Sequence, residues 1–274
     1  MHRMHPQTGR IVGIVLVGMV GLLLGSRLEA QAPAEAKVRK KTVLGSVFAV
    51  DPRFEPMIAD RIEQARSDLR KQRLAGKFTA YLSCPISARG GGYEPTNLEI
   101  SAFTKQRLEA RSGGRIWYLN PGNYQIGRVG GREPEGGEFL WMWTQILAGE
   151  DGLGNDFDLV YFLGPSDAAA FFATFEQPGD RPGDGVDRYI ERQTSDDFKR
   201  AILADPVRLA EFRRFYLLRA SVAWSKGAHD EWNIFVRINR RRGVGEQIPI
   251  YFDGRPVSPA EMETEIAPGY EIKP

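Results

Sequence analysis

The sequence has very few of the side chains that bind soft metals or form covalent cross-links. Cys84 is its single cysteine, so no intramolecular disulfide can form and a hydrophobic core must hold the folded chain together. Of three histidines, only His229 lies beyond residue 32. One thiol and one imidazole do not complete a tetrahedral zinc site. We therefore predict no metal site.

Charge of one sign is also missing once the N-terminal segment is set aside. Residues 1–32 contain three of the 37 basic and one of the 35 acidic residues, which leaves 34 of each sign in the rest of the chain. Nucleic-acid-binding proteins carry an excess of basic residues. The balance therefore predicts no nucleic-acid partner.

The N-terminal segment has the layout of a secretory signal. The uncharged apolar run Ile11–Gly25 follows Arg3 and Arg10, and Ala30-Gln31-Ala32 fits the small-x-small cleavage pattern. The run is shorter than the roughly 20 residues that span a bilayer. We predict a signal peptide over residues 1–32 and export to the periplasm or the extracellular space. The alternative is an uncleaved anchor, which would be the only contact with a membrane.

After a polar stretch at residues 33–42, which we interpret as a linker, residues 43–274 are expected to form one domain. Short apolar runs there alternate with segments of helical periodicity, and this alternation predicts an α/β fold with a doubly wound, mostly parallel, flavodoxin- or Rossmann-like sheet and helical insertions. The predicted strands are Phe78–Leu82, Ile116–Leu119, Leu159–Leu163, Arg219–Trp224 and Ile248–Phe252. The predicted helices include Pro56–Leu74, Glu94–Arg111, Phe139–Leu147, Ala168–Phe175, Asp187–Leu203, Pro206–Leu218 and a helix from about Ser225 to Gly243. Ligands of such folds bind where the carboxyl ends of the strands meet.

Glu231 is the strongest catalytic candidate. It lies near the start of the helix that follows Ser225, where the helix dipole stabilises an anion and lowers the pKa of a carboxyl group. A carboxylate of this kind suits a nucleophile better than a proton donor. The alternative is that Asp230 and Glu231 only complement the positive end of the helix.

Cys84 and His229 both follow predicted strands, so they could meet at one edge of the sheet. A thiol beside an imidazole supports covalent catalysis, and the pair would make the protein a hydrolase. The alternative is that Cys84 is a small buried apolar residue, as lone cysteines usually are.

A glycine-rich loop, Ser87-Ala88-Arg89-Gly90-Gly91-Gly92, connects the first predicted core strand to its helix. Its backbone N–H groups, together with Arg89, can receive an anion such as a phosphate or a carboxylate. It lacks the Gly-Lys-Ser/Thr ending of a P-loop, and its contiguous glycines do not make a dinucleotide fingerprint. The sequence therefore predicts no cofactor, and the alternative role of this loop is a flexible hinge.

Two short segments resemble nucleoside 2-deoxyribosyltransferases. Tyr81-Leu82-Ser83-Cys84-Pro85-Ile86-Ser87 is similar to the strand and Gly-Pro-Ile-Ser-like loop that open that family's fold, with Cys84 in place of the usual glycine. Gly227 to Glu231 is similar to its glycine, three residues and catalytic glutamate, although Ser225-Lys226 stands where the family has an acidic residue. The resemblance implies a flavodoxin-like domain in which Glu231 attacks the anomeric carbon of a nucleoside-like sugar.

The predicted function is therefore an exported N-glycosidase or deoxyribosyltransferase-like enzyme whose partner is a small-molecule ligand, a nucleoside, sugar or anion. The predicted catalytic residues are Glu231, Asp167 and His229. The predicted ligand-binding residues are Cys84, Ser87, Arg89, Gly90, Gly91, Ser225, Gly227 and Asp230. The alternatives are a non-catalytic envelope binding or accessory protein of the same fold, and a Cys84–His229 hydrolase.

Overall fold

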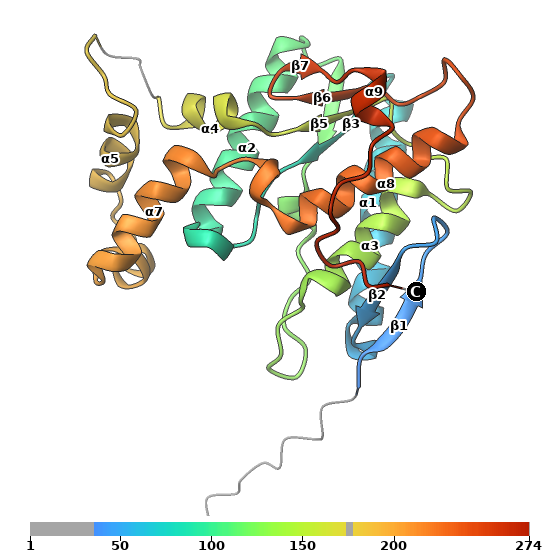
Figure 1. Ribbon diagram of the computed structural model, residues 1–274, viewed down its shortest axis with the longest axis horizontal. Coiled ribbons are helices and arrows are strands. Elements are labelled where there is room, and N and C mark those ends of the chain that lie inside the picture. Colours follow the sequence, from blue (N-terminus) through green and yellow to red (C-terminus); the bar gives the residue numbers. More distant parts are fainter. Residues whose placement is uncertain (1–35, 174–177, 274) are drawn as a thin grey trace, which may run out of the picture. The chain divides into compact units, whose positions relative to one another are not determined.

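The computed structural model describes residues 36–173 and 178–273, so the predicted signal segment lies outside the described residues. A five-stranded sheet forms its centre, in the order β4-β3-β5-β6-β7 (Figure 1). The four parallel strands are β4 (Ile116–Leu119), β3 (Phe78–Ser83), β5 (Leu159–Phe162) and β6 (Ile250–Phe252), and β7 (Arg255–Pro256) pairs antiparallel with β6. The predicted doubly wound α/β fold is confirmed.

Successive side chains of each strand point to opposite faces of the sheet, and helices cover both faces. Tyr81 of β3 and Phe162 of β5 share one face and pack into the main core with α1 (Glu55–Leu74), α3 (Gly136–Ala148) and α8 (Lys226–Arg241). Leu82 and Tyr161 share the other face and pack against Leu108 of α2 (Glu94–Arg111). Strands that are buried on both faces are largely apolar, and the polar exceptions in β3 are the buried Thr79 and Ser83.

The strand order places a topological switch point between β3 and β5. From β3 the chain goes by way of α2 to β4 on one side, and from β4 by way of α3 to β5 on the other. In open α/β sheets, ligands bind outside the carboxyl ends of the strands at such a point. This rule directs attention first to the loops that follow β3 and β5.

The segment between β5 and α8 is a helical insertion. Its elements are α4 (Pro165–Phe171), α5 (Asp184–Glu191), α6 (Asp196–Phe198), a π-helical turn (Lys199–Leu203) and α7 (Pro206–Leu218). The predicted single helix 187–203 is thus broken, because Ser195 accepts a hydrogen bond from the N–H of Phe198 and starts a new helix. The predicted helix 168–175 begins earlier, with Pro165 in the first turn.

Two predictions from short segments were wrong. Residues 38–41 of the predicted linker form β1 (Val38–Lys41), which pairs antiparallel with β2 (Val47–Val50). The predicted strand 219–224 is instead an extended connection and a 3₁₀ turn, Val222–Trp224, because the Ser221 hydroxyl accepts a hydrogen bond from the N–H of Ala223. The N–H of Val222 bonds to the carbonyl of Leu163, the residue that follows β5.

Shorter elements complete the described chain. They are the 3₁₀ turns Pro52–Phe54, Arg89–Gly91 and Pro121–Tyr124, and the short helix α9 (Pro259–Met262). Within residues 36–173 and 178–273, no helix is both long and apolar enough to cross a membrane.

Candidate functional site

A cavity of about 1090 Å³ opens beyond the carboxyl ends of β3 and β4. The loop after β3 contributes residues 84–90, and the start of α8 contributes Ser225–Ala228. Parts of the connection from β4 to α3 form a further wall, and Glu231 and Tyr270 complete the lining. Two of the predicted strand ends therefore meet the start of α8 around one hollow.

Glu231 lies in this cavity and is joined to the sheet. Its side chain comes from α8, and its Oε2 accepts a hydrogen bond of 2.5 Å from the hydroxyl of Ser83, the last residue of β3. The residue is 6% exposed. Ser83 thus fixes the position of one carboxyl oxygen of Glu231.

The pKa of Glu231 is raised to about 7, and burial is the largest cause. The hydrogen bond from Ser83 and the nearby Tyr81 hydroxyl lower this pKa in part, and the charge of Asp230 raises it. The expectation of a lowered pKa was wrong. Since α8 begins at Lys226, Glu231 lies in its second turn, where the helix dipole is weak and desolvation dominates.

Tyr81 is the second buried polar group beside this carboxyl group. Its hydroxyl is fully enclosed, faces Glu231, and does not close a hydrogen bond of normal geometry. Burial, and then the charge of Glu231, raise the pKa of Tyr81 well above its usual value. Tyr81 therefore stays a neutral phenol at any physiological pH.

The structure does not bring Cys84 and His229 together as a dyad. The Cys84 thiol donates to the Ser101 hydroxyl at 3.0 Å, and burial raises its pKa to about 12. The two ring nitrogens of His229 each lie 3.1 Å from a backbone carbonyl oxygen, those of Ala267 and Ala223. A protonated thiol and an imidazole engaged on both sides do not form a nucleophile–base pair.

Asp167 and Asp230 do not line the cavity. Asp167 caps α4, accepts hydrogen bonds of 3.0 Å from Tyr161, and forms an ion pair with Arg107. Its partners place it on the α2 face of the sheet, whereas Glu231 lies on the α8 face. Asp230 points into the C-terminal segment instead. Of the three predicted catalytic residues, only Glu231 faces the cavity.

Most of the predicted ligand-binding residues do line the cavity: Cys84, Ser87, Arg89, Gly90, Ser225 and Gly227. Gly91 does not, because it packs against α7, where an added Cβ would lie 2.9 Å from the Glu211 carbonyl oxygen. The glycine loop is thus fixed by a close approach to α7 and is not simply a hinge.

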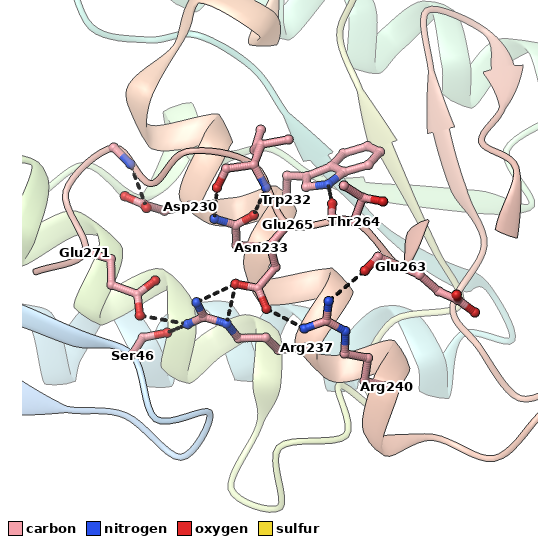
Figure 2. A network of polar contacts seen from close by, with 12 residues as sticks. Ser46, Asp230, Trp232, Asn233, Arg237, Arg240, Glu263, Thr264, Glu265 and Glu271 are labelled. Atoms are coloured by element: carbon pink, nitrogen blue, oxygen red, sulfur yellow. Dashed lines mark hydrogen bonds and ion pairs between the residues drawn. The ribbon is translucent and has the colours of Figure 1, made fainter. Parts of the chain in front are cut away.

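Polar contacts hold the C-terminal segment 263–273 against α8 (Figure 2). Tyr270 of this segment lines the cavity. Asn233 of α8 exchanges two hydrogen bonds with the backbone of Ile266, and Arg237 pairs with Glu265 and Glu271. Asp230 accepts hydrogen bonds from the N–H groups of Gly269 at 2.9 Å and Tyr270 at 2.7 Å.

A close approach at Gly269 lets this segment reach the start of α8. A Cβ on Gly269 would lie 1.9 Å from the carbonyl oxygen of Lys226, so only glycine fits there. Nothing in the sequence around Tyr270 signals a ligand-binding residue, and its role depends on contacts across the whole chain. The same holds for Arg219, Trp224 and Lys226, which also line the cavity and were not predicted.

Comparison of the chain with protein-family models, with curated proteins and with solved structures finds no match. The site must therefore be interpreted from its own geometry.

Proposed function

We propose that the protein is an exported N-glycosidase or glycosyl-transferring enzyme in which Glu231 attacks the anomeric carbon of a nucleoside-like or sugar ligand. The observation that carries the proposal is the Glu231 carboxyl group, which is held by Ser83 at the wall of a cavity of about 1090 Å³. A cavity of this size accepts a ligand of nucleoside or nucleotide dimensions.

The reaction uses the carboxylate form of Glu231. One carboxylate oxygen forms a bond to the anomeric carbon while the glycosidic bond to the leaving base breaks. The base leaves with the electron pair of that bond and takes a proton from water. Attack by water, or by a second acceptor, then breaks the glycosyl ester and restores the carboxylate. With a pKa of about 7, Glu231 is ionised in a large fraction of molecules at neutral pH.

Ser83 and Tyr81 support this role without reacting. The Ser83 hydroxyl donates a hydrogen bond to Oε2 of Glu231 and holds the carboxyl group in one orientation. The enclosed Tyr81 keeps water away from the inner side of the carboxyl group. A desolvated carboxylate is a stronger nucleophile than a hydrated one, because less solvent must be displaced when the bond forms.

Glu231→Gln tests the proposal, with Glu94→Gln as the matched control on a second carboxylate of the cavity wall. Hydrolysis of a panel of nucleosides and nitrophenyl glycosides should fall by at least about 100-fold in Glu231→Gln and stay near the wild-type rate in Glu94→Gln. Melting temperatures and circular dichroism check that both variants fold. Full activity of Glu231→Gln on any substrate found would refute the proposal. Binding without turnover in the wild-type protein would favour the non-catalytic binding protein.

Export is the second part of the proposal and is supported by the residue pattern of the N-terminal segment. Expression of the whole chain, cell fractionation and intact-mass measurement test it directly. We expect a product in the envelope fraction or the medium that lacks residues 1–32. An unprocessed protein confined to the cytoplasm would overturn this part.

A further inference from the structure

The cations that line the large cavity fall into two groups. Arg128 and Arg132 are neutralised by ion pairs, the first with Glu133 and the second with Asp51 and Glu135. The side chains of Arg89, Arg219 and Lys226 form no ion pair and no hydrogen bond within the part of the chain that the structure describes, and all three line the cavity. The second group therefore offers donors that no protein acceptor uses.

The acidic side chains of the wall do not balance this second group. Glu133 and Glu135 are engaged by Arg128, Arg132 and Lys37. Glu94 is the remaining carboxylate besides Glu231, which is partly protonated at neutral pH. Three unpaired cations face one unpaired carboxylate besides Glu231, so the wall carries an excess of positive charge. A cavity with such an excess attracts an anionic ligand.

Arg219 also lines a second cavity, of about 330 Å³, next to the first. The two cavities share Ala88, Gly90 and Arg219, so the Arg219 side chain and the glycine loop stand where they meet. Arg214 lines the smaller cavity and has no ion-pair partner in the described chain, whereas Arg208 is bound to Glu211 at 2.6 Å.

Aromatic rings support two of these guanidinium groups. Arg219 lies over the ring of Trp224 and Arg89 over the ring of Tyr270, each 5.4 Å from the ring centre. Stacking of this kind holds a guanidinium group in place and leaves its N–H donors free. Both arginines are thus held against a ring, and no acceptor among the described residues uses their side-chain N–H donors.

We propose that Arg219, Arg89 and Lys226, together with the glycine loop at Gly90, bind the phosphate of a phosphorylated sugar or nucleotide whose sugar lies toward Glu231. Guanidinium forks match the oxygens of a phosphate monoester, and its charge offsets the excess of the wall. This inference rests on the proposed function, because it names the class of substrate for the same cavity.

Isothermal titration calorimetry at low salt tests the subsite with ribose 5-phosphate, ribose and inorganic phosphate as probes. Ribose 5-phosphate should bind at least about tenfold more tightly than ribose, because it adds charge-assisted hydrogen bonds. Inorganic phosphate should compete with it, and added salt should weaken its binding. Equal affinity for ribose and ribose 5-phosphate, or no detectable binding of ribose 5-phosphate, would overturn the proposal.

Variants assign the effect to named residues. Arg219→Gln should remove most of the preference for ribose 5-phosphate, and Lys226→Gln should weaken it about tenfold or less. The Lys226 side chain is exposed and forms no ion pair or hydrogen bond with the described residues, so that variant should fold normally. Arg111→Gln removes an exposed arginine that lines neither cavity and should leave affinity unchanged. An unchanged preference in both Arg219→Gln and Lys226→Gln would refute the assignment.

The two proposals fail separately. Glu231→Gln should keep its affinity for ribose 5-phosphate while it loses turnover. If Glu231→Gln loses turnover but the wild-type protein binds ribose 5-phosphate no more tightly than ribose, the phosphate subsite is refuted and the role of Glu231 as nucleophile stands. If the wild-type protein prefers ribose 5-phosphate but Glu231→Gln keeps full activity, the role of Glu231 as nucleophile is refuted and the phosphate subsite stands.

Discussion

The hydroxyl of Ser83 and the carboxyl group of Glu231 are joined by a 2.5 Å hydrogen bond across 148 positions of the sequence. Ser83 ends the central strand β3, and Glu231 belongs to α8, so the bond fastens the helix to the sheet at the wall of the cavity. A donor to a carboxylate favours its ionised form. The same contact therefore both orients the carboxyl group and sets its proton affinity.

Replacement of Ser83 by alanine should raise the pKa of Glu231 further above 7, because the donor that lowers it is removed. Carbon-13 NMR of labelled glutamate carboxyl groups measures this pKa, and the signal missing from Glu231→Gln assigns it. If Glu231 is the nucleophile, the acidic limb of the pH–rate profile should move to higher pH in Ser83→Ala.

Ser87→Ala is the control for that measurement. Ser87 lines the same cavity, but its hydroxyl only accepts a hydrogen bond from the N–H of Arg89. Its removal should leave the Glu231 titration unchanged. A Glu231 titration that is the same in Ser83→Ala and in the wild-type protein would contradict the role given to Ser83.

Stability should depend on pH through Glu231. Its pKa is about 7 in the folded protein and near 4.5 when it is exposed, so the folded state holds the proton more tightly. This contribution to the free energy of unfolding is complete below about pH 4.5 and is lost as the pH rises through 7. The loss amounts to about 3 kcal/mol.

Urea unfolding of the wild-type protein and Glu231→Gln between pH 4 and 8 isolates this contribution, because glutamine does not titrate. Asp167 and Asp230 also have raised pKa values, from burial, and are present in both proteins. The difference between the two unfolding free energies should therefore change with pH in the direction stated. A constant difference would show that Glu231 is hydrated in the folded protein.

Asp230→Asn should loosen the C-terminal segment. The carboxylate accepts two backbone hydrogen bonds, from Gly269 and Tyr270, and an amide side chain turns one acceptor into a donor. Loss of such a buried bond costs about 1–3 kcal/mol. Urea unfolding measures the loss, and hydrogen exchange should show faster opening at residues 263–273.

Asp196→Asn is the matched control, because Asp196 and its ion-pair partner Lys199 are both exposed. It should change stability by less than about 0.5 kcal/mol. If hydrogen exchange at residues 263–273 stays slow in Asp230→Asn, Arg237 and Asn233 alone hold the segment in place.

Cys84 should resist alkylation in the folded protein. Its pKa of about 12 leaves roughly one thiol in ten thousand ionised at pH 8, and the side chain is buried. Mass spectrometry after treatment with iodoacetamide should show little adduct under native conditions and one adduct in urea. Rapid native labelling with loss of activity would revive a thiol mechanism.

The local sequence pattern was enough to predict elements whose apolar residues recur at regular spacing. The helix 94–111 was predicted with the bounds that it has, and β3 exceeds its prediction by one residue, Ser83. The prediction of a strand at residues 219–224 was wrong because so short an apolar stretch shows no regular spacing that would distinguish a strand from a turn. A single hydroxyl, that of Ser221, turns it into a 3₁₀ turn.

The site was predictable where loops follow strands and not where distant segments meet. Glu231 was expected beside the end of a strand at 219–224, but that segment is a 3₁₀ turn, and Glu231 reaches the sheet instead through Ser83 of β3. Its raised pKa was not predictable, because it arises from burial against Tyr81 and Ser83, far away in sequence. The role of Tyr270 depends on Asp230, whose carboxylate looked like a helix-start residue but binds the C-terminal segment.

The sheet ends at β7, which has only two residues, the second of them Pro256. The N–H of Val257 bonds inward to the carbonyl of Ile250, so the alternation of an antiparallel ladder turns the nitrogen of Pro256 outward. A proline nitrogen carries no hydrogen, and another chain that approached this border would find no donor with which to begin a new ladder. This border should therefore not seed fibrils or edge-to-edge aggregates when the protein is concentrated.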